Sequence, residues 1–217
     1  MKSKFVGAVL AVIALFAIAS VAQEIPKLEL AGGYSYINFH PGTSIITSQN
    51  MNGGGGSAVF NFSKYFGIKA DFMGYAVGTG WTQKLISLGY PVTGSASGNL
   101  FTYMFGPQIK KHSGRLQPFG EGLFGAAHSN GYGTILGCLS GNDPNSCNLK
   151  NGHGNNNAFA MEWGGGLDWA VSPKVQIRPV EVDYLYTNFS SNHVARIANS
   201  QNSFKYFAGV NFTLGGK

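Results

Sequence analysis

Charged side chains are scarce in this sequence. Only 11% of the 217 residues are Asp, Glu, Lys or Arg, whereas about 25% is usual for a soluble globular domain. Aromatic residues are frequent instead, with 16 Phe and 10 Tyr, and there are 32 Gly. Although the chain is basic, with a net charge of +6, it has no Lys/Arg cluster interleaved with stacking aromatics. The composition therefore argues against nucleic-acid binding and favours a membrane-facing protein built of strands.

Long hydrophobic runs are also rare, and the one of membrane-helix length is at the start. Lys2 and Lys4 precede an apolar segment, 5–19, and Ser20-Val21-Ala22 follows it. This order is typical of a cleaved secretory signal peptide. The alternative is an uncleaved helical anchor, for which the apolar run is only marginally long enough. We expect residues 1–22 to be the signal peptide and residues 23–217 to form one exported domain.

Cysteine is limited to two residues, Cys138 and Cys147. Nearby cysteines in an exported protein are expected to form a disulfide. Closing a loop of about ten residues removes roughly 2.5–3 kcal/mol of unfolded-state freedom. The bond would either stiffen a loop that meets a partner or protect that loop from proteolysis.

Alternating side chains are clearest in the last stretch, 203–214. Every second residue is apolar or aromatic, and the residues between them are mostly polar, which is the periodicity of a β-strand. Such a strand could pack its apolar side on a protein core, or on lipid in a barrel with a polar interior. The apolar set is Phe204, Tyr206, Ala208, Val210, Phe212 and Leu214.

Similar alternation predicts eight strands in all. The connections between them alternate between long and short, with four long and three short. Short turns on one side and longer loops on the other are the layout of outer-membrane barrels, and a closed sheet satisfies every backbone group in hydrocarbon. The predicted strands are 28–39, 53–62, 67–76, 99–109, 116–127, 158–170, 175–187 and 203–214.

The seventh predicted strand contains a change of phase. Gln176 and Arg178 alternate in one register, whereas Glu181 and Asp183 alternate in the other. A β-bulge at Pro179, which cannot donate a backbone hydrogen bond, would return all four side chains to one face.

Three segments carry a family resemblance: PFGEGLFGAA at 118–127, GGGLDW at 164–169 and RPVEVDY at 178–184. Together with the eight-strand layout, they resemble the small outer-membrane barrels related to the transmembrane domain of outer membrane protein A. The resemblance implies an all-β, eight-stranded antiparallel up-and-down transmembrane barrel in a bacterial outer membrane. Gly209, Phe212 and Leu214 resemble the terminal signal that the barrel assembly machinery reads. Outer-membrane lipid and that machinery are then the expected partners.

The polar faces of the predicted strands hold most of the charge. About eight strands leave an interior just wide enough for side chains, and charges in such a space need partners. We therefore expect a salt-bridged, hydrated plug, with a cation leak gated around Arg178 as the alternative. The expected inward charges are seven acids, Glu29, Asp71, Glu121, Glu162, Asp168, Glu181 and Asp183, and three bases, Lys69, Arg178 and Lys205.

Aromatic side chains are expected to form a girdle at each end of the lipid-facing surface. One set is predicted near the long loops and another near the short turns. Basic residues at the short turns could pair with lipid phosphates or be ordinary solvated side chains. The girdles are Tyr34, Tyr36, Tyr184, Tyr186, Phe204 and Tyr206, and Phe62, Trp169 and Phe212; the turn bases are Lys64, Lys110, Lys111, Arg115, Lys174 and Lys217.

The patterns for catalysis and metal binding are weak. The 120–125 segment matches a dinucleotide fingerprint, but no helix is predicted to follow it. His40, His128, His153 and His193 lie in or beside four separate loops, which is a poor metal site. His128 and Ser129 resemble the pair of lipid A deacylases, but adjacent residues of a strand face opposite sides.

The favoured function is thus a structural or adhesive role, with an extracellular ligand or surface contacted through the four long loops. A narrow ion or small-solute channel is the second hypothesis, and a lipid A-modifying enzyme is the third. No enzyme activity, cofactor or metal is expected.

Overall fold

The computed structural model describes residues 25–40, 48–78, 80–87, 89, 98–130, 155–189 and 200–215. The signal-peptide prediction falls outside these residues, as do Cys138 and Cys147. Within them, no helix is long and apolar enough to cross a membrane. The described chain forms eight strands and one short helix: β1 (Leu28–Phe39), β2 (Gln49–Asn61), β3 (Phe66–Gly78), α2 (Gly80–Ser87), β4 (Gly98–Lys110), β5 (Leu116–Asn130), β6 (Asn155–Ala170), β7 (Val175–Asn188) and β8 (Gln201–Leu214).

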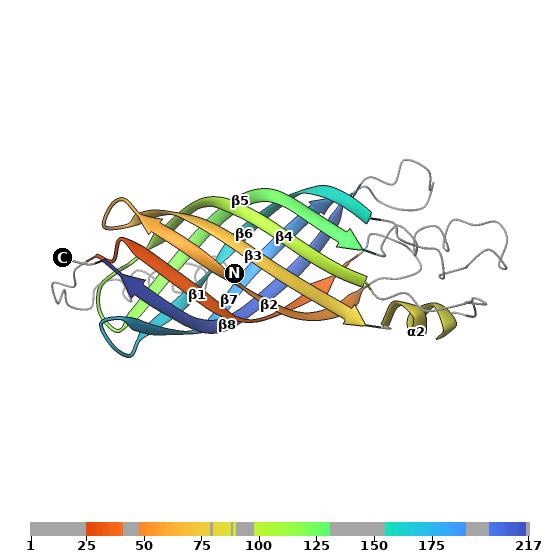
Figure 1. Ribbon diagram of the computed structural model, residues 1–217, viewed down its shortest axis with the longest axis horizontal. Coiled ribbons are helices and arrows are strands. Elements are labelled where there is room, and N and C mark those ends of the chain that lie inside the picture. The colour runs from red at the N-terminus through yellow and green to blue at the C-terminus, as the bar shows by residue number, and fades with distance from the viewer. Residues whose placement is uncertain are drawn as a thin grey trace, which may run out of the picture.

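The strands close into one antiparallel barrel in sequence order (Figure 1). β1 pairs with β8 from Leu28↔Leu214 to Asn38↔Phe204, so the sheet has no free edge. Closure matters because unpaired backbone groups at an edge would have no partners in hydrocarbon. The predicted up-and-down eight-stranded barrel is confirmed.

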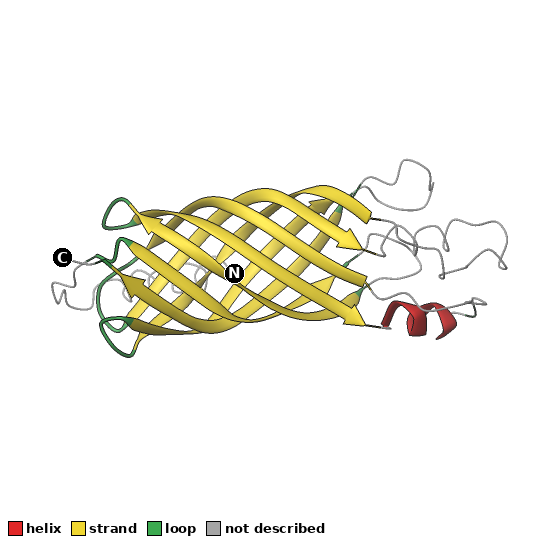
Figure 2. Ribbon diagram, viewed as in Figure 1, coloured by secondary structure: helices red, strands yellow, loops and turns green. Residues whose placement is uncertain are grey.

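The connections are sorted as predicted. The three short turns, 62–65, 111–115 and 171–174, are at one end of the barrel, here called the short-turn end (Figure 2). Two of them use the same local chemistry, since Ser63 Oγ accepts a hydrogen bond from Phe66 N and Ser172 Oγ accepts one from Val175 N, each at 3.1 Å. A serine hydroxyl that caps the turn in this way favours a tight reversal. The other end, where 40–48, 79–97, 131–154 and 189–200 connect the strands, is called the long-loop end.

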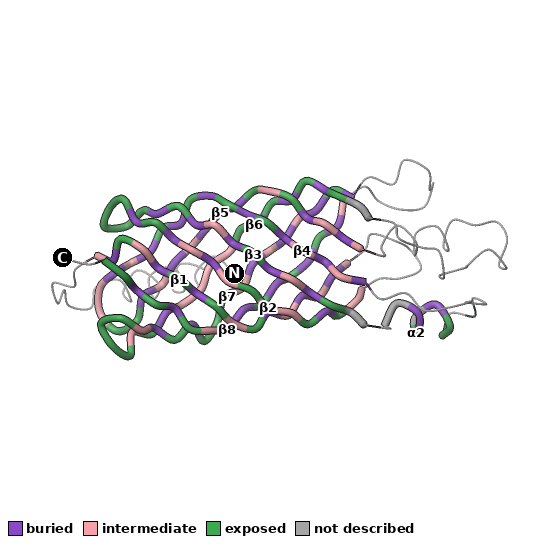
Figure 3. The backbone as a smooth tube through the Cα atoms, viewed as in Figure 1, coloured by how far each residue is buried: buried purple, intermediate pink, exposed green. Residues whose placement is uncertain are grey.

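Burial alternates along every strand (Figure 3). Large apolar side chains on the outside keep about half of their surface exposed, for example 58% for Phe60 and 54% for Phe72. The residues between them are buried in the lumen, including Lys69 and Asp71 at 0% exposure. In water such an outside would be a large exposed apolar surface, whereas it matches the apolar band of a transmembrane barrel.

The bulge predicted at Pro179 is confirmed. The register between β7 and β8 shifts between Arg178 and Glu181. As a result Gln176, Arg178, Glu181 and Asp183 are all buried on the lumen side.

Several strands extend further towards the long-loop end than predicted. β2 begins at Gln49, β5 ends at Asn130 and β6 begins at Asn155. Polar pairs on neighbouring strands accompany these extensions, such as Asn38 Nδ2 donating to Asn50 Oδ1 at 2.6 Å. Polar residues at the rim show no apolar alternation, which is why the sequence pattern missed them.

Helix α2 is a second difference from prediction, because it lies inside a segment expected to be a loop. It follows β3 directly at the long-loop end of the barrel (Figure 1). Its Leu85 is fully buried, whereas Ile86 is 58% exposed. An eight-residue helix is too short to be stable alone, so burial of Leu85 stabilises it.

Glycines on the inner wall let neighbouring strands approach closely. A Cβ at Gly33 would lie 2.2 Å from the carbonyl oxygen of Ala208 on β8, where the barrel closes. At Gly32, which faces outwards, the nearest atom would be 3.8 Å away. The two adjacent glycines thus differ sharply in how much space they leave.

We expect Gly33→Val to prevent closure of the barrel and Gly32→Val to allow it. The test is refolding from urea into detergent, followed by gel electrophoresis with and without heating, which separates folded from unfolded barrels. Equal refolding of the two variants would contradict this role of Gly33.

Candidate functional site

The lumen is the candidate site, because all seven acidic residues of the described chain are buried in it. Each of the ten charged residues predicted to face inwards has its side chain in the lumen. Their partners come from strands across the barrel and could not be named from the sequence. They form two adjoining groups, one towards the short-turn end and one at mid-height.

Arg178 connects the two groups. Its Nε and Nη2 donate to Asp168 at 2.7 and 2.9 Å, and its Nη1 donates to Glu181 Oε2 at 2.7 Å. The guanidinium carbon also lies 4.3 Å from the centre of the Phe119 ring. A bidentate ion pair stacked on an aromatic ring is a geometry that arginine supplies and lysine does not.

Lys110 lies in the lumen and not among the short-turn bases that were predicted to meet lipid phosphates or solvent. It is 1% exposed, and its Nζ donates to Glu29 Oε2, to Asp168 Oδ2 at 2.6 Å and to Gln176 Oε1 at 2.9 Å. The alternation of β4 places it on the lumen side with Gln108. The same alternation can be read in the sequence, but the predicted strand, 99–109, ended one residue before Lys110.

His112 was also missed as a lumen residue. It is 4% exposed, and its Nε2 lies 2.7 Å from Glu29 Oε1, while its Nδ1 lies 3.0 Å from the carbonyl oxygen of Lys64. The group at the short-turn end therefore consists of Glu29 and Asp168 with Lys110, Arg178 and His112.

The mid-height group contains five carboxylates and two lysines. Lys69 Nζ donates to Glu121 at 2.6 Å and to Glu181 at 3.0 Å. Lys205 Nζ donates to Glu162 at 2.5 Å and lies 3.1 Å from Asp183 Oδ2. The fifth acid, Asp71, lies 3.5 Å from Lys69 Nζ and 3.8 Å from Lys205 Nζ.

The long-loop half of the lumen is largely apolar, although buried polar side chains such as Thr187, Gln201 and Ser203 also lie there. This apolar character was not predicted from the sequence. Here buried hydrophobic side chains from all eight strands and from α2 pack together. The hydroxyl of Tyr75, in this zone, lies 3.0 Å from Ser35 Oγ and so has a hydrogen-bond partner. This apolar zone consists of Ile37, Phe39, Met51, Met73, Tyr75, Leu85, Leu100, Met104, Leu123, Ala127, Ala158, Ala160, Leu185, Phe189 and Phe207.

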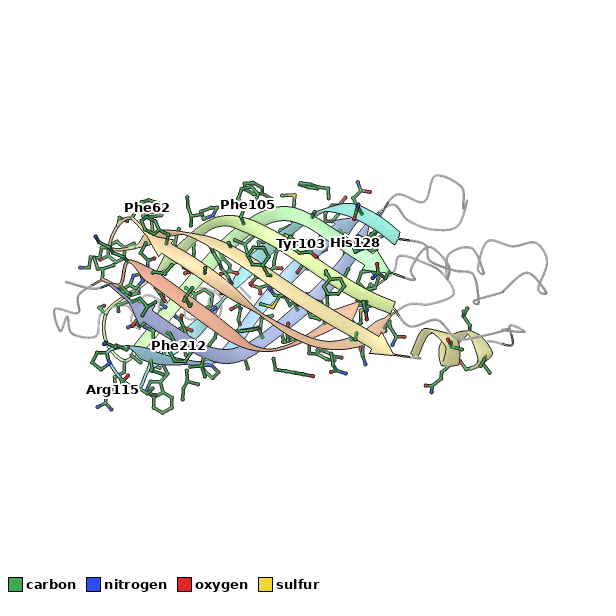
Figure 4. The ribbon with its side chains drawn as sticks, viewed as in Figure 1. Phe62, Tyr103, Phe105, Arg115, His128 and Phe212 are labelled. Carbon is green, nitrogen blue, oxygen red and sulfur yellow. The ribbon has the colours of Figure 1, made fainter. Side chains whose placement is uncertain are left out.

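Aromatic rings gather on the outside of the barrel. Trp163 and Tyr184 have ring centres 4.8 Å apart, and Tyr184 and Phe204 are 5.5 Å apart, while Tyr36 and Tyr206 are 6.1 Å apart. Phe62 and Phe212 lie near the short-turn end, on the outer surface (Figure 4). Outward aromatic rings also lie between the two ends, such as Phe105 and Phe124 with ring centres 4.5 Å apart, so two separate girdles stay a prediction.

The residues of the predicted assembly signal lie on β8. Phe212 and Leu214 face outwards and are 50% and 45% exposed, and Gly209 pairs with Gly33 of β1. Their recognition by the assembly machinery stays a prediction.

His128 and Ser129 face opposite sides of β5. Ser129 is buried, whereas His128 lies towards the outside and its Nδ1 lies 2.5 Å from Asn157 Oδ1. The two side chains therefore do not form the nucleophile and base pair that a serine esterase needs. Of the other rim histidines, His40 is described, and His153 and His193 lie outside the described residues.

Solved structures with the same architecture support the description of the fold. The crystal structure of Neisserial surface protein A matches with a TM-score of 0.59 at 13% sequence identity, over 87% of this chain and 97% of that chain. The chain has the fold of the small eight-stranded outer-membrane barrels.

Other barrels match less well in shape. For Ail, the attachment invasion locus protein of Yersinia pestis, the TM-score is 0.47 at 11% identity, over 87% of this chain and 99% of that chain. For OprG of Pseudomonas aeruginosa it is 0.44 at 10% identity, over 89% and 98%. No protein-family model and no curated protein matches the chain.

We expect Lys110→Met to lower the free energy of unfolding of the barrel by about 3–5 kcal/mol, because it leaves Glu29 and Asp168 buried with too few partners. Lys174→Met, at an exposed turn of the same end, is the matched control and should change it by less than about 0.5 kcal/mol. Urea unfolding in detergent micelles measures both. Equal effects would show that Lys110 is solvated.

Proposed function

We propose that this protein is an exported barrel of the bacterial outer membrane that acts through its four long connections, in a structural or adhesive role. The observation that carries this proposal is the filled lumen inside an apolar outer wall. Because the wall suits lipid and the interior is packed with side chains, the connections at the long-loop end are the surface left for a partner.

The charge distribution supports a membrane position. Every acidic side chain of the described residues is inside the barrel. The charged side chains on the described outer surface are therefore all basic. Lys64, Arg115 and Lys174 lie in the short turns, and Figure 4 shows Arg115 at this end. Basic residues beside an apolar band suit the phosphates of a lipid leaflet. We propose that these turns face the periplasmic leaflet.

The channel hypothesis has less support. An ion that crosses this barrel has to pass the apolar zone, where Ile37, Leu100 and Leu185 are 0–1% exposed, and a dehydrated ion has no ligands among such side chains. At the other end, the Arg178 and Lys110 ion pairs fill the lumen. The structure of the described residues thus favours a sealed barrel.

We expect no ion conductance above background when the folded protein is inserted into planar bilayers. Arg178→Ala should also be silent, because it opens only the charged half of the lumen and leaves the apolar zone in place. Stepwise conductance that changes in Arg178→Ala would instead establish the gated channel.

An enzyme role has no support from the described residues, because Ser129 and His128 point apart. Mass spectrometry of lipid A from expressing cells would reveal the loss of an acyl chain if the barrel were a deacylase. We expect the lipid A to be unchanged.

The orientation can be tested with epitope tags. We expect a tag inserted in 131–154 to bind antibody on intact cells, because that connection is at the long-loop end, and a tag in the turn 171–174 to bind only after permeabilisation. The second insertion is the matched control for expression and folding. The opposite labelling pattern would overturn the proposed orientation.

The adhesive role needs a separate measurement. Cells of a non-adherent strain that display the barrel are scored for attachment to immobilised extracellular matrix. Replacing 131–154 by a Gly/Ser segment of equal length should preserve heat-modifiable gel migration and lower attachment. Attachment no greater than that of cells without the barrel would contradict adhesion to this surface.

A further inference from the structure

The mid-height group of the lumen contains more negative charge than its bases balance. At the short-turn end, Glu29 and Asp168 are matched by Lys110 and Arg178. At mid-height, five carboxylates surround two lysines, which leaves an excess of three negative charges in the described residues. The five acids are Asp71, Glu121, Glu162, Glu181 and Asp183, each 8% exposed or less.

The two lysines cannot serve all of these oxygen atoms. An ammonium group has three donors, and Lys69 already shares its donors between Glu121 and Glu181. Arg178 contributes one further hydrogen bond, to Glu181. Buried carboxylates without partners are costly in a confined interior, so a further positive charge would stabilise this group.

Five carboxylate oxygens of the mid-height group accept no hydrogen bond from any described residue. They are both oxygens of Asp71, Glu162 Oε2 and both oxygens of Asp183, and these residues are 0%, 1% and 0% exposed. Glu162 and Asp183 belong to a set of four, with Glu121 and Glu181, that each offer one oxygen within 4.8 Å of the other three. Unused acceptors in an anionic cluster are the ligands that a hard cation takes.

The spacing indicates the size of that cation. Calcium binds oxygen at 2.3–2.6 Å, so ligands on opposite sides of the ion are about 4.6–5.2 Å apart, whereas magnesium at 2.0–2.1 Å brings them to about 4.2 Å. Calcium also tolerates irregular geometry and carboxylates from separate strands. Oxygens that lie within 4.8 Å of one another are therefore compatible with ligands of a calcium ion.

We propose that the lumen binds one divalent cation of calcium's size between Glu121, Glu162, Glu181 and Asp183. The ion reduces the charge excess of the mid-height group from three to one and fastens β5, β6 and β7 together from inside. Lys69 is paired with Glu121 and Glu181, and Lys205 with Glu162 and Asp183, so the ion shares each of its carboxylate ligands with a lysine. The site depends on the closed barrel and not on what the long connections contact.

The experiment uses the full mature barrel, refolded from urea into detergent with calcium present so that access through the closed lumen is not limiting. After removal of free ions, the metal content of the folded band is measured by mass spectrometry. The thermal unfolding midpoint is then compared for protein refolded with calcium chloride, with magnesium chloride or with chelator alone.

We expect one calcium per folded chain and a midpoint about 5–10 °C higher with calcium at roughly a hundredfold above its Kd. Magnesium should have a smaller effect. In the double variant Glu162→Gln, Asp183→Asn, both the bound calcium and the calcium-dependent shift should be lost. This variant also removes repulsion between carboxylates and should fold.

The matched control is Glu29→Gln, which makes the same chemical change in the other group of the lumen. It should lower stability but keep one bound calcium. Wild-type protein that retains no calcium and has the same midpoint in calcium and chelator would overturn the proposal and leave protons to balance the charge. Calcium retained equally by the double variant would also overturn it, since the ion would then lie elsewhere.

Discussion

Pairing of buried charge is the constraint on which this barrel depends. A closed eight-stranded sheet has an interior only wide enough for side chains, and every acid of the described chain points into it. Arg178 and Lys110 at one end, and Lys69 and Lys205 at mid-height, each bind carboxylates from at least two strands. Contacts such as Lys69 with Glu181 and Lys110 with Glu29 join strands that are not neighbours, so they set how the strands sit across the lumen in a way that hydrogen bonds between neighbouring strands alone do not.

The apolar zone of the lumen contains few groups whose charge has to be paired. Near the long-loop end most of the buried side chains are aliphatic or aromatic, and Leu85 of α2 packs among them. Polar side chains there include Thr187 and Gln201, which are hydrogen-bonded to each other. From the short-turn end to the long-loop end, the lumen thus changes from balanced ion pairs, through an anionic group, to a largely apolar zone. In both halves of the described barrel, buried side chains occupy the lumen.

The outer wall has the opposite composition, with apolar side chains where the lumen has charged ones. With the described acids inside, the outside of the barrel presents apolar side chains along the strands and basic side chains at the short turns. Aromatic contacts such as Trp163 with Tyr184 link neighbouring strands on this face. The chain has few charges overall, but the charged side chains of the described residues are sorted by side and by end, so a sequence with 11% charged residues still forms a dense network in the lumen.

The sequence by itself determined the architecture: period-two alternation, the order of long and short connections and the phase change at Pro179 predicted eight strands, their inward acids and the bulge. These are local properties, since alternation assigns a face to each side chain without reference to any other strand. Only the tertiary structure decided that Lys110 and His112 join the lumen, that α2 lies in a predicted loop, and that the long-loop half is largely apolar. It also decided which acid meets which base. Those outcomes depend on the stagger with which the strands close, which brings together residues as far apart as Glu29 and Asn211, and no pattern within one strand records that stagger.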